Sequence, residues 1–185
     1  MNRPAGRVQR TKQRSDVAWT AFPTAKGWMG VAASPAGLVR IVLPKAEEAQ
    51  VVGELEPEFG PPTPAEALPP ILQDLQARLV AYFQGQKVAF DDPLDPSLGT
   101  PFRRRVWEEL RAVPRGQVVT YAELARRAGR PRAARAVGQA MARNPCPVVV
   151  PCHRVVGSDG SLVGYGGGID LKAHLLGLEG VLLPL

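Results

Sequence analysis

Three prolines fix the backbone around the short run that holds both cysteines of the chain. Pro145, Pro147 and Pro151 lie within the segment 145–156, PCPVVVPCHRVV. Because proline locks its own φ, the chain is held rigidly around the two sulfur atoms. A rigid frame of this kind raises the question of what the thiols do.

Three uses of Cys152 are open: core packing, a metal ligand or a nucleophile. A buried, inert side chain is the commonest fate of a lone cysteine. A metal site needs three or four ligands, and the chain has two Cys and two His in total, so structural zinc is not expected. The nucleophile is favoured, because His153 is adjacent and the glycine-rich loop 164–168, GYGGG, could admit a ligand to backbone contact. Glu179 is one carboxylate available to orient the imidazole.

Basic residues are concentrated in the second half of the chain. Residues 1–98 carry 10 Lys and Arg against 11 Asp and Glu, whereas residues 99–185 carry 13 against 6. Between Arg111 and Arg143 there are eight arginines and a single acid, Glu123. Such a patch suits a phosphate backbone. A solvated basic face is the alternative that charge alone leaves open.

The first half of the chain is typical of a small sheet with one helix. Glycine and proline divide its start into three predicted strands, VAWTAF, GWMGVAAS and GLVRIVLP, between residues 17 and 44. The stretch 57–70 is expected to be a proline-rich loop, and 69–85 a helix with apolar residues at helical spacing. Residues 1–98 contain no Cys or His, and nothing in this half looks catalytic.

Two domains are predicted, joined where periodicity is lost. Residues 1–16 are expected to be a disordered basic arm, residues 17–91 an N-terminal domain, residues 92–99 a linker and residues 100–185 a C-terminal domain. The basic arm lacks the apolar segment of a signal peptide, and the longest apolar runs are too short to span a bilayer. With two cysteines only, we expect an intracellular protein with both thiols reduced.

Three helices are predicted at the start of the second half. The stretch 101–113 is amphipathic, Thr120 is an N-cap for a helix over 121–129 with Glu123 placed for a capping box, and a third helix covers 131–144 with Pro131 near its start. The second and third helices match a helix-turn-helix. The third is rich in small residues and bears Arg132 and Arg135, which suits close approach to nucleic acid or, equally, close helix packing.

Several motifs, in order, resemble the 6-O-alkylguanine-DNA alkyltransferases. PCHRVV is followed by GYGGG and KAHLLGLEG, and is preceded by TYAELARRAG, ARAVGQAM and NPCP. The resemblance covers residues 100–180, and the first half is compatible with the family only in general terms. It implies an α/β (α+β) fold, with a small N-terminal ribonuclease-H-like domain and a C-terminal winged helix-turn-helix domain that carries the active site.

The resemblance also implies a role for each matching residue. Cys152 would accept the alkyl group, His153 would act as its base through a bridging water, and Glu179 would orient and charge the imidazole. Tyr121 would donate to the departing guanine, and Asn144 would be the hinge before the active-site strand. Residues expected to contact DNA or the flipped base are the arginine finger Arg135, the pocket-wall Met141, the flanking Tyr165, the Val155 carbonyl, and Arg132, Ala134, Ala136, Gly138, Gly166 and Gly167.

The activity implied is a single-turnover repair of DNA. In members of the family the helix-turn-helix enters the minor groove of double-stranded DNA, and the alkylated guanine is flipped out of the stack. The alkyl group then moves from the 6-oxygen to the cysteine. A 4-O-alkylthymine is a further expected substrate. No cofactor and no metal are expected, and the protein is expected to be a cytoplasmic monomer.

Two departures from the family pattern and two rival functions remain. Gly166 stands where relatives often carry a hydroxyl residue, which removes a side-chain contact to the 6-oxygen. Some relatives hold zinc in the N-terminal domain, for which residues 1–98 offer no Cys or His.

The first rival function is a damage sensor that binds DNA without transferring anything, which Cys152 argues against. The second is a cysteine hydrolase, which would not need a basic helix-turn-helix.

Overall fold

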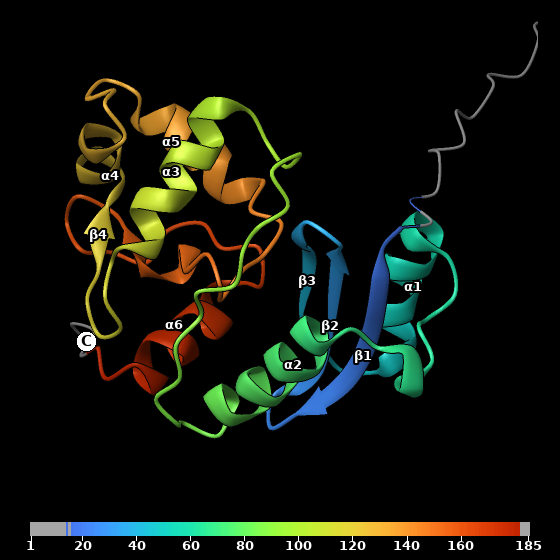
Figure 1. The fold of residues 1–185 in the computed structure, drawn as a ribbon. Coiled ribbons are helices and arrows are strands. Elements are labelled where there is room, and N and C mark those ends of the chain that lie inside the picture. The colour runs from blue at the N-terminus through green and yellow to red at the C-terminus, as the bar shows by residue number, and fades with distance from the viewer. Residues whose placement is uncertain (1–13, 15, 182–185) are drawn as a thin grey trace, which may run out of the picture.

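The first half of the chain folds into a three-stranded antiparallel sheet, in the computed structural model that describes residue 14 and residues 16–181 (Figure 1). Strands β1 (Ala18–Thr24), β2 (Gly27–Ser34) and β3 (Gly37–Lys45) lie in the order β1-β2-β3. The three strands predicted from glycine and proline punctuation are confirmed, each to within two residues.

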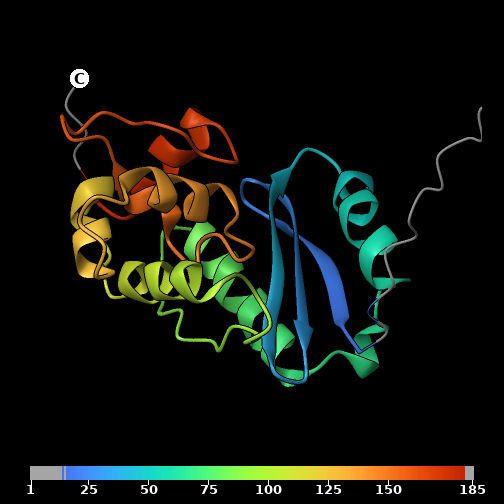
Figure 2. The same cartoon turned by 90° about the horizontal axis from the view of Figure 1, so that it is seen from above.

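One helix covers each face of the sheet. Helix α1 (Glu48–Phe59) packs on one face, and α2 (Pro70–Phe83) packs on the other, between the sheet and the second half of the molecule (Figure 2). The sequence did not predict α1, and the expected loop 57–70 is wrong at its start because Pro57 to Phe59 are helical. Pro57 lies in the last turn of α1, where it removes one backbone hydrogen bond, and the helix ends two residues later. A short 3-10 helix, η1 (Ala65–Ala67), precedes α2.

The predicted linker 92–99 is attached to the edge of the sheet. The backbone N–H of Leu38 donates to the Pro93 carbonyl at 2.8 Å, and the N–H of Asp95 donates to the Leu38 carbonyl at 2.9 Å. Gly37 makes this approach possible, because a Cβ there would lie 2.5 Å from the Pro93 oxygen. The buried Asp95 carboxylate accepts hydrogen bonds from Ser34 at 2.6 Å and Arg14 at 2.9 Å. The division into two domains at this segment stays a prediction, and the expected basic arm, apart from residues 14 and 16, lies outside the described residues.

The second half is mainly helical, as the sequence predicts. Its elements are α3 (Pro101–Arg111), β4 (Val119–Thr120), α4 (Tyr121–Arg127), α5 (Ala134–Ala142), η2 (Cys152–Arg154), β5 (Val155–Val156) and α6 (Ile169–Leu178). Helices α3, α4 and α5 enclose a core that includes Val106, Trp107 and Leu110. The two short strands pair in parallel.

Two details of the helix pair differ from expectation. Thr120 accepts from the N–H of Glu123 at 3.1 Å, as predicted for an N-cap. The Glu123 carboxylate, however, binds Arg126 and Arg127, so the reciprocal bond of a capping box is not formed. Helix α5 begins at Ala134, so Pro131 lies in the turn before it and not in its first turn. Gly129, at φ 76°, lets the chain reverse between the two helices.

One of the hydrophobic cores extends across both halves of the chain. Side chains of the sheet and of α2 pack together with Cys146, Val148 and Val149 and with Leu171 and Leu175 of α6. The backbone N–H of Ile41 in β3 also donates to the Pro145 carbonyl at 2.8 Å. The proline-rich frame around the cysteines is therefore fixed against the sheet of the first half.

Candidate functional site

A tight turn of the proline-rich segment presents Cys152. Val148 adopts φ 76°, a left-handed conformation that a β-branched residue rarely takes. The turn is closed by the N–H of Val150 donating to the Cys146 carbonyl at 2.8 Å. Cys152 then begins η2, and its side chain is 8% exposed.

Asn144 links this turn to the sulfur atom. Its Nδ2 donates to the Val150 carbonyl at 2.8 Å and to Sγ of Cys152 at 3.1 Å, while its Oδ1 accepts from the N–H of Cys146 at 3.0 Å. Burial raises the pKa of the Cys152 thiol to about 11, and the hydrogen bond from Asn144 opposes that rise. At neutral pH the sulfur is therefore a protonated thiol at rest, and its reaction as a nucleophile requires a base.

His153 is held by Glu179 in the interior behind Cys152. Nε2 of His153 lies 2.9 Å from Oε1 of Glu179, and both side chains are fully buried. Burial lowers the pKa of His153, an effect that the bond to Glu179 partly offsets, so the imidazole is neutral at physiological pH. Since the carboxylate only accepts, Nε2 carries the proton. Nδ1 is then a free base, and it has no hydrogen-bond partner within the described part of the chain.

Glu179 is ionised because three donors surround it. Arg154 donates to Oε2 through Nε at 2.8 Å and to Oε1 at 2.9 Å, and the Tyr82 hydroxyl donates to Oε1 at 2.8 Å. Burial raises the pKa of this carboxyl, but the bonds from His153 and Arg154 outweigh burial and hold the pKa well below its usual range. The result is a buried negative charge beside the imidazole.

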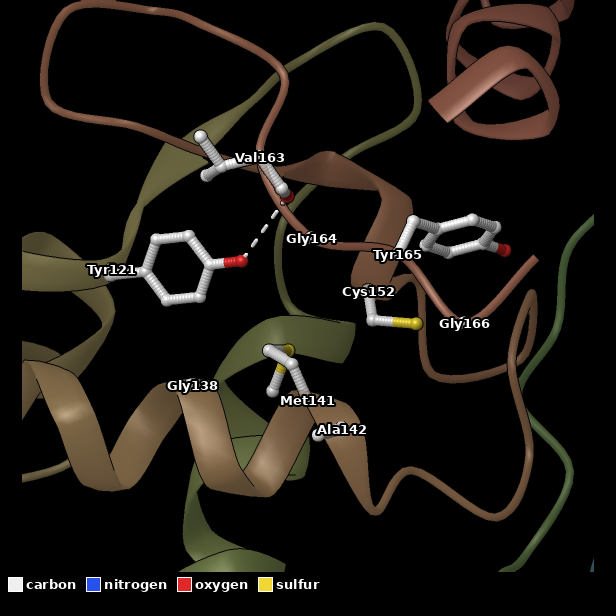
Figure 3. A pocket seen from close by; sticks show the side chains of 9 residues that line it. All are labelled: Tyr121, Gly138, Met141, Ala142, Cys152, Val163, Gly164, Tyr165 and Gly166. Carbon is white, nitrogen blue, oxygen red and sulfur yellow. Dashed lines mark hydrogen bonds between the residues drawn. The ribbon is translucent and has the colours of Figure 1, made fainter. Parts of the chain in front are cut away.

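A pocket of about 500 Å³ opens in front of the sulfur. In Figure 3 the thiol lies between α5 and the loop 163–166, with the ring of Tyr121 on one side and that of Tyr165 on the other. The Tyr121 hydroxyl points to the Val163 carbonyl, 3.5 Å away. Burial raises the pKa of Tyr121, with a smaller contribution from Cys152, so its hydroxyl stays protonated. The residues lining the pocket are Tyr121, Gly138, Met141, Ala142, Cys152, Val163, Gly164, Tyr165 and Gly166.

Comparisons with known proteins agree on one family. A sequence model described as "6-O-methylguanine DNA methyltransferase, DNA binding domain" matches residues 101–181. A methylated-DNA–protein-cysteine methyltransferase of Methanosarcina acetivorans is 47% identical over 108 residues, which cover 58% of this chain and 69% of that protein. The crystal structure of Mycobacterium tuberculosis O6-methylguanine methyltransferase is 36% identical, with a TM-score of 0.70, and the match covers 88% of this chain and 92% of that one.

The chain belongs to the 6-O-methylguanine-DNA methyltransferase family. A relative named methylated-DNA–protein-cysteine methyltransferase from Salmonella typhimurium is 51% identical over 109 residues. That match spans 59% of this chain and 64% of the Salmonella protein. The Mycobacterium tuberculosis relative is also known in complex with DNA, and this structure matches with a TM-score of 0.72.

Most residues that the family resemblance singles out lie at one place. Tyr121, Gly138, Met141, Tyr165 and Gly166 line the pocket with Cys152, and Asn144, His153 and Glu179 lie behind it. The expected DNA contacts Arg132, Arg135 and Ala136 are exposed, Ala134 is half-buried, and Gly167 follows the pocket loop. Val155 is fully buried and its carbonyl accepts from Lys172 Nζ at 2.5 Å, and its expected contact with the flipped base stays a prediction.

Three residues of the site were not predicted from the sequence. Lys172 is fully buried, where burial lowers its pKa, and it ties Val155 to the pocket loop through a second bond to the Val163 carbonyl at 2.8 Å. Arg154 directly follows Cys152 and His153 in the sequence, and this position beside the motif could have identified it as a site residue. Tyr82 lies on the buried face of α2 with Leu75 and Leu79, so its spacing looks like that of a core residue.

The described residues contain neither a candidate metal-binding cluster nor a membrane-spanning helix. Within residue 14 and residues 16–181, no group of three or more His, Cys, Asp and Glu is placed to hold a metal ion. None of the helices described above is long and apolar enough to cross a membrane.

Proposed function

We propose that this protein repairs DNA by moving an alkyl group from the 6-oxygen of guanine to Cys152. The observation that carries the proposal is the Cys152 thiol at the wall of the pocket, with a neutral imidazole and an ionised carboxylate behind it. The alkylated oxygen lies inside the duplex stack, so the nucleotide must be turned out before the thiol can reach it.

The proposed transfer is a single displacement. The Cys152 proton passes to the free Nδ1 of His153 through a bridging water, and Glu179 stabilises the imidazolium that forms. The sulfur then attacks the alkyl carbon, the carbon–oxygen bond breaks, and guanine leaves with the bonding electrons. Tyr121 supplies a hydrogen bond or proton to the departing base, which limits its negative charge. The thioether has no route back to the thiol, so each molecule acts once.

The finer features of the family are part of the same proposal. The sheet with α1 and α2 would be the ribonuclease-H-like domain, and α3 to α5 with the small strands the winged helix-turn-helix domain, joined by the segment 92–99. The exposed face of α5, with Arg135 and Ala136, supports double-stranded DNA as the partner. The protein would bind it through the minor groove, as a monomer inside the cell. An alkylated thymine would enter the same pocket with its 4-oxygen facing Cys152.

Mass spectrometry of the intact protein tests the proposed function. After mixing with duplex DNA that contains one 6-O-methylguanine, the protein should gain one methyl group permanently, located on Cys152. Transfer should stop at one equivalent, because the thioether is stable. Cys146 should stay unlabelled, since it is fully buried and burial raises its thiol pKa far above the usual range.

Two variants provide the controls. Cys152→Ala should transfer nothing and still bind DNA, because the phosphate contacts lie on other residues. Cys146→Ala should retain transfer. No mass gain in the wild type would indicate a damage sensor, and repeated turnover would indicate a hydrolase; either result would contradict the proposal.

A further inference from the structure

The hydroxyl of Tyr82 reaches the catalytic network from the first half of the chain. Tyr82 lies on α2, 71 residues before His153, and is 1% exposed. Its oxygen lies 2.8 Å from Oε1 of Glu179 and 3.5 Å from Nε2 of His153. The phenol is therefore adjacent to the bond that joins the carboxylate to the imidazole, although Tyr82 is not one of the residues that line the pocket.

The ring of Tyr82 has one position because aromatic and cationic side chains enclose it. Phe83 and Phe90 meet it edge to face at centroid distances of 5.5 and 5.6 Å. The guanidinium of Arg115 stacks 5.4 Å from its centroid and also donates to the Leu178 carbonyl, next to Glu179. Burial raises the pKa of Tyr82 far above its usual range, so the hydroxyl is a donor at every pH at which the protein works.

The two remaining donors to Glu179 come from a single segment. His153 and Arg154 are neighbours in η2, so both approach the carboxylate from the same turn. Tyr82 is the donor that comes from another element, and it binds the same oxygen as the imidazole, Oε1. A donor there stabilises the ionised carboxylate and limits its rotation away from Nε2.

We propose that Tyr82 is a positioning residue for the alkyl transfer: its hydroxyl holds Glu179 in the orientation in which Oε1 meets His153. The inference rests on the proposed function, because the orientation matters only if His153 takes the thiol proton. Through Tyr82 the first half of the chain acts on the chemistry of the second half.

The test is Tyr82→Phe, which removes one oxygen and keeps the ring. The rate constant for reaction with a free 6-O-alkylguanine base should fall about tenfold, which corresponds to about 1.4 kcal/mol. Affinity for unmodified duplex DNA should not change. With ¹⁵N-histidine, NMR follows only two imidazoles, because the chain has two His, and the Nε2–H resonance of His153 should move.

Leu75→Ala is the matched control on the same helix. Leu75 is fully buried two turns before Tyr82 and forms part of the shared core, and its side chain has no polar atom that could bond to Glu179 or His153. It should lower the unfolding midpoint and leave both the rate and the His153 resonance unchanged. Equal slowing in Leu75→Ala and Tyr82→Phe would reduce Tyr82 to a packing residue and overturn the proposal.

The outcomes separate this inference from the proposed function. If the wild type transfers the alkyl group and Tyr82→Phe has the same rate constant and the same His153 resonance, only the role of Tyr82 is overturned. A wild type that transfers nothing overturns the proposed function itself. If Tyr82→Phe does not fold, a nuclear Overhauser contact between the Tyr82 hydroxyl proton and the His153 Nε2 proton in the wild type decides: its absence contradicts the geometry on which the proposal depends.

Discussion

Gly166 leaves one wall of the pocket without a side chain. A Cβ built at this position would meet no atom within 4 Å, so a larger residue fits without displacing its neighbours. Gly166→Ser would place a hydroxyl donor where negative charge develops on the 6-oxygen. We expect the reaction with a free 6-O-alkylguanine base to become roughly threefold to tenfold faster, since one hydrogen bond contributes about 1 kcal/mol. Single-turnover kinetics measures the change.

Gly166→Ala is the control for this prediction, because it adds the same Cβ without the hydroxyl. The Ala variant should react at the wild-type rate or slightly more slowly, since alanine also narrows the backbone freedom of the loop. A Ser variant no faster than the Ala variant would mean that backbone N–H groups already donate hydrogen bonds to the 6-oxygen. The missing side chain would then not slow the transfer.

The sequence indicates most single residues of the site and misses those whose hydrogen bonds to it form only when distant segments come together. Cys152, His153 and Glu179 could be named because each is a reactive residue type next to a recognisable motif. Tyr82 could not, because the same spacing that buries Leu75 and Leu79 also buries its ring, and only the folded chain shows where the hydroxyl ends. The left-handed turn at Val148 is also unexpected, since valine disfavours that conformation and only the surrounding core and Asn144 hold it.

Two exposed arginines with different expected roles lie near each other, Arg132 in the turn before α5 and Arg135 in its first turn. Arg132 and Arg135 form no ion pair or side-chain hydrogen bond with any described residue, whereas Arg126 and Arg127 are bound to Glu123. Arg135→Ala should slow repair of alkylated duplex DNA tenfold to a hundredfold, if about 1.4 to 2.8 kcal/mol of base-flipping energy is lost. It should leave the reaction with a free alkylated guanine base almost unchanged, because that substrate needs no extrusion.

Arg132→Ala is the comparison, measured at the same salt concentration. It should weaken DNA binding mildly and lower the salt dependence by about one phosphate contact, without a specific loss in repair. The structure makes Arg132 a better control than Arg127, whose charge is partly neutralised by Glu123. Equal loss on duplex and free base would assign Arg135 to the fold or the pocket. Loss that only follows binding affinity would make it one more phosphate contact.

The elements themselves could be predicted where local signals are strong. The three strands are bounded by glycine and proline, and α2, α3 and α4 have clear apolar spacing or a capping threonine. Helix α1 was missed because its apolar residues are interrupted by glutamates, Gly53 and Pro57, and its stability comes from packing Val51 and Leu55 on the sheet. The attachment of residues 93–95 to β3 is a long-range contact that no local pattern encodes.

Several ionisable groups are buried in the folded chain, so the free energy of unfolding should depend on pH. Glu179 has a folded pKa held below its unfolded value of 4.5, and its contribution is therefore present above that pH and lost as the pH falls. Asp95, for which bonds from Ser34, Ser97 and Arg14 outweigh burial, acts in the same direction. Burial lowers the folded pKa of His153 below 6.5, so protonation of the unfolded chain destabilises the fold as the pH falls below 6.5. We expect urea unfolding to show stability declining below pH 6.5 and again below pH 4.5.

Glu179→Gln isolates the largest of these contributions. The variant keeps the shape of the side chain but leaves the Arg154 guanidinium without its buried counter-charge, which should cost about 3 to 5 kcal/mol at pH 7. The gap in unfolding free energy between wild type and variant should be constant above pH 4.5 and shrink towards acid, because the wild-type carboxylate is then protonated as well. Since the Tyr82–Glu179 bond and the shared core join the two halves, both should unfold in one transition throughout. A gap that does not change with pH, or two separate transitions, would contradict the view that this network stabilises the molecule as a single unit.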